Sequence, residues 1–392
     1  MTFPGIFELE CYSQNYTWGK KGSHSLVAKL SKQTPIEENL PYAELWMGTH
    51  PNCPSRTKDN QELLSDRLKN YPELLGAYVI SRWAELPFLF KILSIDQPLS
   101  LQAHPDKKKA EELHRSDPRH YPDSNYKPEI ALPLNGLTSL YGFRNTQELS
   151  RFFSKFPPLG NIFSDDFNKE NGFASSFSKI MNMKKSEIDA ITSECMEYIA
   201  ENKYAGDLHT ELFCSEYTRY KEDIGLILLF FMQIFTVPMG KAMFVDKNQL
   251  HAYLQGELAE CMANSDNTVR GGFTTKYQDA NSLKDMLTFQ SSPNPLIEGK
   301  KIDKYSKRYS AALKEFELHE IYIPKNESLS WRNNGVPEIF IVISGAGQLK
   351  YKHGGIPVER GVVIFVGAGY SYEINSSINL QIIRATIPTP EK

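Results

Sequence analysis

The sequence is poor in cysteine and lacks the short cysteine motifs. Its 392 residues include five cysteines, Cys11, Cys53, Cys195, Cys214 and Cys261. An odd number of cysteines without a CxxC pair argues against a disulfide framework and against a zinc ribbon. A chain of this length buries enough surface to fold without disulfides or a structural metal ion. We therefore expect reduced thiols in a cytoplasmic protein.

Long hydrophobic runs and charge of one sign are also missing. The most apolar segment, residues 224–239, is shorter than the roughly 20 residues that a membrane span requires. Residues 1–5 do not read as a secretory leader, because no basic stretch precedes an apolar one. The chain carries 44 basic and 47 acidic residues, and its densest basic run, 107–109, is followed by two glutamates. Neither a membrane nor a nucleic acid is an expected partner.

Composition changes along the chain predict its organisation. Residues 1–145 and 224–300 carry apolar segments typical of strands, whereas residues 146–223 place apolar side chains at helical spacing among polar ones. Residues 301–392 repeat a strand–turn–strand pattern with glycine turns, one of them at 344–347. The sequence therefore predicts a mainly β protein with two cupin- or jelly-roll-like domains. A helical domain at 146–223 would interrupt the first, and the second would hold no metal.

Four polar residues interrupt otherwise apolar elements. Gln102 and His104 fall on one face of a predicted strand, so an amide oxygen and an imidazole nitrogen share one side. Glu129 and His251 each enter a further apolar segment. Nitrogen and oxygen ligands with one carboxylate suit zinc. The alternatives are hydrogen-bonded core histidines and a simple surface pair between Lys127 and Glu129.

A second candidate region, residues 260–276, is small, polar and rich in glycine, with one guanidinium and one ammonium. Such a loop can line a pocket in which Arg270 and Lys276 meet an anion or a developing oxyanion. An ordinary surface loop closed by Gly271 and Gly272 is the alternative. The segment is not a P-loop, because the spaced glycines followed by Lys-Ser/Thr are missing.

Several long motifs stand in an order that is typical of one enzyme family. They are YAELWMGTHP at 42–51, LPFLFK at 86–91, LSLQAHPDK at 99–107, YPD at 121–123 with KPE at 127–129, and HAY at 251–253 with ECMA at 260–263 and SDN at 265–267. With these motifs the chain resembles the type I mannose-6-phosphate isomerases, zinc-dependent enzymes of the cupin superfamily. The resemblance implies an aldose–ketose isomerase that interconverts mannose 6-phosphate and fructose 6-phosphate through a cis-enediol(ate). It also implies one zinc ion per chain and a supply of mannose 6-phosphate for GDP-mannose and glycan synthesis.

The resemblance assigns roles to particular residues. It implies that the zinc ligands are Gln102, His104, Glu129 and His251, and that Arg270 is the essential arginine. Ser100 and Lys127 match positions associated with the substrate phosphate, while Trp18, Glu260, Asp266 and Lys276 would line the pocket. The proton-transfer base stays open among Glu260, Asp266, Lys276 and a water molecule at the metal. A hexose 6-phosphate is the expected partner of a monomeric chain.

Two departures from the family pattern affect the predicted site. Leu250 stands where a proline usually precedes the last ligand, and Gly271 and Thr275 replace an alanine and a proline. The second change predicts a looser loop between Arg270 and Lys276, and a reduced turnover. One alternative function is a cupin that senses a sugar phosphate without turning it over. Another is a metal-dependent dioxygenase, although such enzymes use a histidine-rich iron triad rather than a glutamine ligand.

Overall fold

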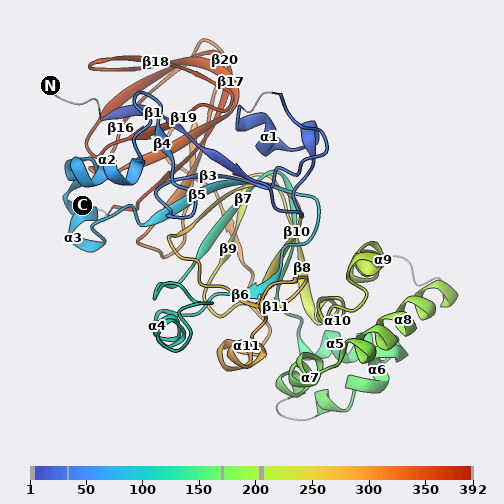
Figure 1. Ribbon diagram of the computed structural model, residues 1–392. Helices are drawn as coiled ribbons and strands as arrows, with labels where there is room; N and C mark the ends of the chain where they lie inside the picture. Colours follow the sequence, from blue (N-terminus) through green and yellow to red (C-terminus); the bar gives the residue numbers. More distant parts are fainter. Residues whose placement is uncertain (1–4, 33–34, 169–171, 203–206, 390–392) are drawn as a thin grey trace.

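The computed structural model describes residues 5–32, 35–168, 172–202 and 207–389. Within these ranges the chain forms two ten-stranded antiparallel sheets and a group of helices that projects from one of them (Figure 1). The prediction of a mainly β protein is confirmed. No helix in the described ranges is long and apolar enough to span a membrane, and the apolar segment 224–239 is divided between a helix and a strand. Residues 1–4, where the sequence predicts no leader, lie outside the described residues.

The first sheet carries most of the predicted site residues. Its strands run in the order β12-β9-β7-β10-β5-β3-β2, with β8 beside β7 and β6 between β10 and β11. Their bounds are β2 (Tyr12–Gln14), β3 (Glu44–Met47), β5 (Phe88–Ile95), β6 (Leu101–Ala103), β7 (Glu129–Phe143), β8 (Met232–Val237), β9 (Lys241–Val245), β10 (His251–Ala263), β11 (Val269–Gly272) and β12 (Leu296–Glu298). Helices α1 (Leu26–Leu30), α4 (Lys107–Ser116) and α11 (Ala280–Met286) lie at its margins. Asp106 caps the start of α4, because its carboxylate accepts a hydrogen bond from the Lys109 amide.

A run of helices separates β7 from β8 in the part of the chain where the sequence predicts helices. They are α5 (Thr146–Phe153), α6 (Pro157–Phe163), α7 (Gly172–Met181), α8 (Lys185–Asn202), α9 (Leu208–Tyr220) and α10 (Gly225–Leu229). Asn145 caps α5 through the Glu148 amide. Aromatic packing then ties the group to the sheet, since the rings of Phe143 in β7 and Phe173 in α7 have centroids 5.4 Å apart.

The second sheet is built mostly from the last ninety residues. Its strands are β13 (Lys300–Lys301), β14 (Ser306–Tyr309), β15 (Glu317–Ile323), β16 (Ser328–Arg332), β17 (Glu338–Tyr351), β18 (Gly354–Glu359), β19 (Val363–Val366) and β20 (Ser371–Thr386), joined by β1 (Ile6–Glu10) and β4 (Arg56–Thr57). Strand β1 pairs with β19, with Ile6 opposite Val366. Helices α2 (Leu64–Asn70) and α3 (Gly76–Arg82) follow β4 in the chain. The N-terminal segment therefore contributes to the sheet of the C-terminal segment.

The predicted turn at residues 344–347 is wrong. Strand β17 continues through this segment from Glu338 to Tyr351, and its pairing with β20 shifts register between Val342 and Gly347. Gly345 has φ +90°, and a Cβ there would lie 2.0 Å from the Asn379 carbonyl oxygen. The glycines thus permit β-bulges and a close backbone approach within one long strand, instead of a chain reversal.

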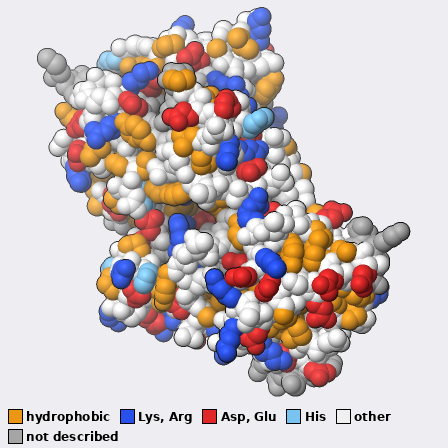
Figure 2. All heavy atoms as spheres, turned by 45° about the vertical axis from the view of Figure 1, so that its right-hand side comes forward, with side chains coloured by type: hydrophobic (Ala, Val, Ile, Leu, Met, Phe, Trp, Pro, Cys, Tyr) orange, Lys and Arg blue, Asp and Glu red, His pale blue; other side chains and the backbone are white. Residues whose placement is uncertain are grey.

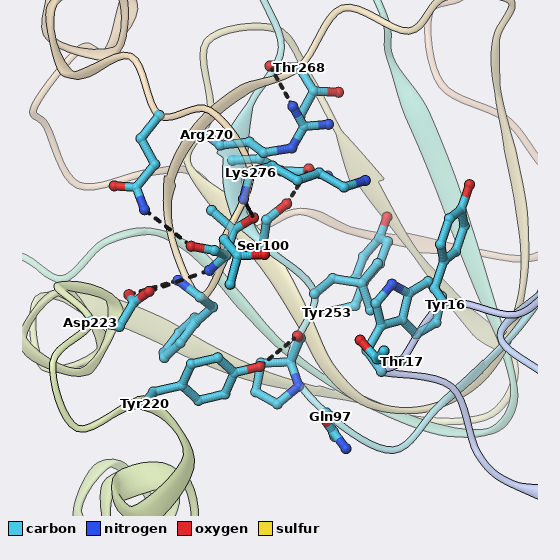
Figure 3. Close-up of a pocket in the computed structure, with 18 of the residues that line it drawn as sticks. Tyr16, Thr17, Gln97, Ser100, Tyr220, Asp223, Tyr253, Thr268, Arg270 and Lys276 are labelled. Carbon is cyan, nitrogen blue, oxygen red and sulfur yellow. Dashed lines mark hydrogen bonds between the residues drawn. The ribbon is translucent and has the colours of Figure 1, made fainter. Parts of the chain in front are cut away.

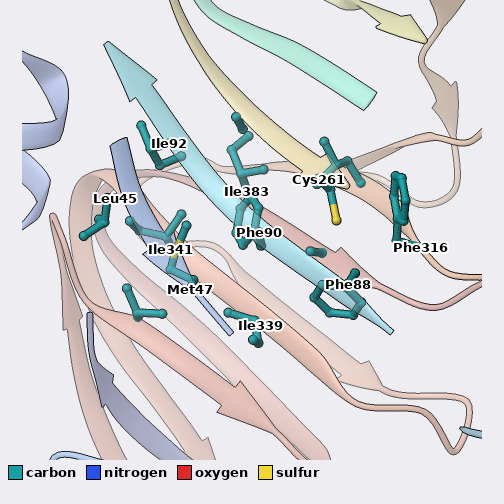
Figure 4. Close-up of a cluster of buried hydrophobic side chains, with 14 of the residues drawn as sticks. Leu45, Met47, Phe88, Phe90, Ile92, Cys261, Phe316, Ile339, Ile341 and Ile383 are labelled. Atoms are coloured by element: carbon teal, nitrogen blue, oxygen red, sulfur yellow. The ribbon is translucent and has the colours of Figure 1, made fainter. Parts of the chain in front are cut away.

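The two sheets pack face to face over a shared hydrophobic core. Figure 4 shows Phe90 and Ile92 of β5 facing Ile341 of β17 and Ile383 of β20, and all four side chains are buried. Side chains alternate along a strand, so Lys91 and its neighbours at odd positions of β5 point to the other face of the first sheet. That other face is left to line a cavity.

Candidate functional site

A cavity of about 1230 Å³ lies against the face of the first sheet that points away from the second sheet. On the side drawn in Figure 2, the molecule narrows to a waist between its β portion and its helices, and basic and acidic side chains are interspersed. Nine of the eleven residues singled out from the sequence line the cavity: Trp18, Ser100, Gln102, Lys127, Glu129, Glu260, Asp266, Arg270 and Lys276. The other two, His104 and His251, are fully buried beside Glu129.

Strand pairing brings the predicted metal ligands together. Gln102 of β6 lies opposite His251, the first residue of β10. Glu129 begins β7, which pairs along the other edge of β10, and His104 follows β6 directly. One ligand atom from each of His104, Glu129 and His251 lies within 4.8 Å of the others. Strand register makes Gln102 and His251 direct neighbours, whereas Glu129 lies opposite Met262, at the other end of the β7–β10 pair, and meets the two histidines across the bent sheet.

Hydrogen bonds orient both imidazoles towards the Glu129 carboxylate. Nδ1 of His104 lies 2.9 Å from the Asn267 carbonyl oxygen, and Nδ1 of His251 lies 2.9 Å from the Gln249 carbonyl oxygen. A carbonyl can accept but not donate, so in each neutral ring Nδ1 carries the proton and Nε2 keeps its lone pair. Both Nε2 atoms are buried without a hydrogen-bond partner. Hydrogen bonding at Nδ1 is the usual way in which a metal-ligating histidine is fixed.

The protonation states match those of metal ligands. Burial, reinforced by Lys127, lowers the pKa of His104 to about 4, and burial also lowers the pKa of His251. Burial alone would raise the pKa of Glu129, but the Lys127 ammonium outweighs it and holds that pKa well below its usual range. Two neutral imidazoles and an ionised carboxylate are the forms that bind a divalent cation.

The lone pairs of the two imidazoles and of the Glu129 carboxylate repel one another, and a cation placed between them would remove this repulsion. Nε2 of His104 lies 3.0 Å from Oε1 of Glu129, and Nε2 of His251 lies 3.7 Å from Oε2. With both imidazoles neutral and protonated at Nδ1, lone pairs of the rings face carboxylate lone pairs. The residues therefore fit a metal ion placed among them, and their nitrogen and oxygen donors suit zinc.

Ser100 and Lys127, which the sequence associates with a phosphate, lie next to these ligands. The Ser100 hydroxyl donates to Oε1 of Gln102 over 2.9 Å, and Nζ of Lys127 lies 3.1 Å from Oε1 of Glu129. The Tyr253 hydroxyl donates to Oε2 of Glu129 over 3.1 Å. Both oxygens of Glu129 are thus held in place, and its neighbours line the same cavity.

A buried charge network on β3, β5 and β10 escaped the sequence reasoning. The Lys91 ammonium lies 3.6 Å from Glu44 and 3.3 Å from Glu260, and the Trp46 indole donates to Glu44. Burial acts to lower the pKa of Lys91, but the two carboxylates raise it above its usual range. Burial together with Glu129 raises the pKa of Glu260 to about 7. The sequence did contain one indication of this network, because Lys91 stands at the centre of β5, a strand in which all eight residues are buried.

Two residues hold Asp266 at the edge of the cavity: His50, within the 42–51 motif, and Asn52, directly after it. The His50 ring, buried against Trp46, places Nε2 3.3 Å from Asp266 Oδ1. The Asn52 side-chain amide donates to Asp266 Oδ2 over 2.9 Å. Burial acts to raise the pKa of Asp266, but His50 outweighs it and lowers that pKa. His50 thus orients an ionised carboxylate that lines the cavity.

Arg270 and Lys276 give the cavity its positive charge. Arg270 lies on β11 opposite Gln102, and its guanidinium reaches the Thr268 carbonyl at 3.5 Å (Figure 3). Nζ of Lys276 lies 5.4 Å from the centre of the Tyr16 ring, and Tyr16 in turn stacks on Trp18. Within the described part of the chain, neither cation has a carboxylate at ion-pair distance. Such cations are available to an anionic ligand.

Comparisons with known proteins agree with this geometry. Residues 6–146 match the phosphomannose isomerase type I catalytic domain. The chain is 34% identical to the mannose-6-phosphate isomerase of Mus musculus, over 98% of this chain and 99% of that protein. It is also 34% identical to mannose-6-phosphate isomerase 2 of Arabidopsis thaliana, over 97% and 93% of the two chains. The crystal structure of a mannose 6-phosphate isomerase bound with zinc and yttrium superposes with a TM-score of 0.86 at 25% identity, over 98% of this chain and all of that one.

These similarities extend over nearly the whole chain, not one motif or one sheet. The chain belongs to the type I mannose-6-phosphate isomerase family, and it is an isomerase.

Proposed function

We propose that the cavity interconverts mannose 6-phosphate and fructose 6-phosphate. The reaction moves a proton between C2 and C1 of the open-chain sugar through a cis-enediol(ate). The observation that carries the proposal is a single cavity that reaches the metal-competent group through Glu129. The same cavity is lined by two cations that have no carboxylate partner among the described residues and by a buried carboxylate whose pKa is near neutral. Proton abstraction beside a carbonyl requires positive charge to stabilise the oxygens and a base to take the proton, and these groups can supply both.

We infer that Gln102, His104, Glu129 and His251 hold one zinc ion. The orphaned Nε2 atoms of the two histidines and the ionised Glu129 support this assignment. A solved relative that superposes on this chain is bound with zinc and yttrium. When bound, zinc supplies a Lewis acid that polarises substrate oxygens.

Arg270 would stabilise the negative charge that develops on the substrate oxygens. It lies across the strand pair from Gln102, so its guanidinium and the metal ligands share one part of the cavity. A fixed cation in a partly buried site stabilises such charge far better than water does. Ser100 and Lys127 would hold the phosphate, and Trp18 and Lys276 would close the cavity around the sugar.

Glu260 is the best candidate for the proton-transfer base. Its side chain lines the cavity, is 4% exposed and has a pKa raised to about 7. A general base is most effective when its pKa lies close to the working pH. Asp266 and Lys276 remain the alternatives, but the pKa of Asp266 is lowered by His50, and Lys276 is an exposed residue of its loop.

The wider setting follows the family resemblance. We propose a monomeric cytoplasmic enzyme that supplies mannose 6-phosphate for GDP-mannose and glycan synthesis. We further propose that residues 1–145 and 224–300 form the catalytic cupin domain, apart from β1 and β4, which join the second sheet. Residues 146–223 would form a helical insertion, and residues 301–392 a cupin-like domain without metal. Size-exclusion chromatography with light scattering tests the monomer directly.

A conservative substitution at Glu260 tests the catalytic proposal. Glu260→Gln keeps the size of the side chain and removes its basicity, so turnover of mannose 6-phosphate should fall by roughly 10²-fold or more, while bound zinc stays equimolar. Glu298→Gln, at an exposed position of β12, is the matched control and should leave both quantities unchanged. A Glu260→Gln protein with normal turnover would exclude Glu260 as the base.

A further inference from the structure

The loop that carries Arg270 and Lys276 is weakly held by its own strand. Strand β11 pairs with β6 at Val269, Arg270 and Gly272, and the register shifts between Arg270 and Gly272. Phe273 follows with φ +50°, a conformation that non-glycine residues rarely adopt. A strained residue of this kind persists only where its surroundings over-determine it. The contacts beyond β11 therefore decide where the two cations lie.

Asp223, from the junction between α9 and α10, reaches into this loop (Figure 3). Its Oδ1 accepts hydrogen bonds from the Phe273 amide at 2.8 Å and the Gly225 amide at 2.7 Å. Its Oδ2 accepts from the Thr274 amide at 3.3 Å. One carboxylate thus bridges two segments that are fifty residues apart. Burial raises the pKa of Asp223, and the three backbone amides act in the opposite direction by stabilising its charged form. Hydrogen bonds to a charged acceptor are stronger than those between neutral groups.

Close packing surrounds the same bridge. A Cβ on Gly272 would lie 2.9 Å from the Gly225 backbone, and a Cβ on Gly225 would lie 2.8 Å from the Phe273 ring. The Phe273 side chain is 4% exposed and meets the Tyr220 ring edge-on at 5.0 Å. The Tyr220 hydroxyl in turn donates to the Pro98 carbonyl over 3.5 Å. The end of the helical segment and the loop are therefore fitted to each other at backbone distance.

We propose that Asp223 is a positioning residue for the isomerase site. It clamps the Phe273–Thr274 backbone to the end of the helical segment and so holds Arg270 and Lys276 against the cavity. This inference rests on the proposed roles of these two cations. It gives the helical segment a function in catalysis, because the junction between α9 and α10 supplies the stiffness that the loop lacks at Gly271 and Thr275.

Asp223→Asn tests the clamp with little change in volume. The amide nitrogen would face a backbone N–H donor, so at least one of the three hydrogen bonds is lost. We expect kcat for mannose 6-phosphate to fall at least tenfold with unchanged zinc content. Hydrogen exchange at the Phe273 and Thr274 amides should accelerate at least tenfold, and trypsin should cut faster after Arg270 and Lys276.

Asp303→Asn is the matched control. Asp303 lies in the connection between β13 and β14 of the second sheet and does not line the cavity, and its Oδ1 accepts from the Tyr305 and Ser306 amides at 2.7 and 2.8 Å. The control should keep kcat and the exchange rates of the Phe273 and Thr274 amides. Three results would each overturn the inference. They are unchanged hydrogen exchange in Asp223→Asn, unchanged kcat in that variant despite faster exchange, and an equal loss of kcat in the Asp303→Asn control. Hydrogen exchange and proteolysis can be measured without turnover. If the wild-type protein has no isomerase activity, the proposed function is refuted. Faster exchange and faster proteolysis in Asp223→Asn would then still test whether Asp223 clamps the loop.

Discussion

Gln102 lies directly opposite Arg270 in the pairing of β6 with β11. On its other side, Gln102 lies opposite His251 of β10. A short central strand therefore fixes the distance between the candidate metal ligands and the cation that would act with the metal. This arrangement explains why the two groups, which are separate motifs in the sequence, form one site.

The position of Arg270 predicts a specific kinetic effect. Arg270→Ala should lower kcat for mannose 6-phosphate by roughly 10²- to 10³-fold, because it removes a fixed cation from a partly buried site. Zinc content, measured by elemental analysis, should stay at one equivalent. The exposed Arg360 provides a matched control, and Arg360→Ala should retain full activity. A parallel loss of zinc and activity in Arg270→Ala would show that the residue is structural.

The network around Lys91 predicts a pH-dependent loss of stability. Lys91→Met removes the cation between Glu44 and Glu260 and leaves both carboxylates buried, which should cost about 3–5 kcal/mol at pH 8. Without the ammonium the folded-state pKa of Glu260 rises further, so the folded protein takes up a proton more readily and the loss should shrink as pH falls towards 5. Thermal unfolding of the variant and wild type across this range measures the difference. An identical loss at pH 8 and pH 5 would contradict this account.

A buried histidine in the second sheet predicts that the free energy of unfolding falls in acid. His319 accepts from Arg384 at Nδ1 and donates from Nε2 to Glu317 over 2.8 Å, which fixes it as a neutral ring. Burial, reinforced by Arg384, lowers its pKa to about 4. Above pH 6.5 the ring is neutral in both states and the stability is fully present. As pH falls from 6.5 to 4, the unfolded chain binds a proton that the folded chain refuses, and about 3 kcal/mol of stability at most is lost.

His319→Gln separates this effect from the titration of nearby carboxylates. The variant cannot gain charge at this position, so its melting temperature should fall less between pH 6.5 and pH 4 than that of the wild type. His24→Gln, at an exposed position, should follow the wild-type curve. If all three proteins lose the same stability over this range, His319 is not the group responsible.

The sequence predicted the parts of the molecule that depend on local pattern. Period-two alternation placed Gln102 and His104 on one face, and the structure brings both to the Glu129–His251 pair. The helices between β7 and β8 lie where their spacing predicts them, and the strands β8 to β12 lie in the range 224–300 that the sequence predicts to return to strands. Such features follow from a few consecutive residues and the burial of one face.

The features that escaped prediction depend on contacts between distant segments. The pairing of β1 with β19, the bulges that replace a turn in β17 and the Asp223 bridge all require the register of elements far apart in the chain. The departures at Gly271 and Thr275 predicted a loose loop, whereas the structure holds that loop through Asp223 and buried Phe273. A reduced turnover stays a prediction.

The central claim is that the chain isomerises mannose 6-phosphate with a metal held by His104, Glu129 and His251. The most direct measurement is the rate of fructose 6-phosphate formation from mannose 6-phosphate before chelation, after chelation and after addition of zinc, with the bound metal counted at each stage. The account predicts that chelation abolishes the rate and that one equivalent of zinc per chain restores it. Full activity in the metal-free protein, or one equivalent of bound zinc without turnover, would contradict it.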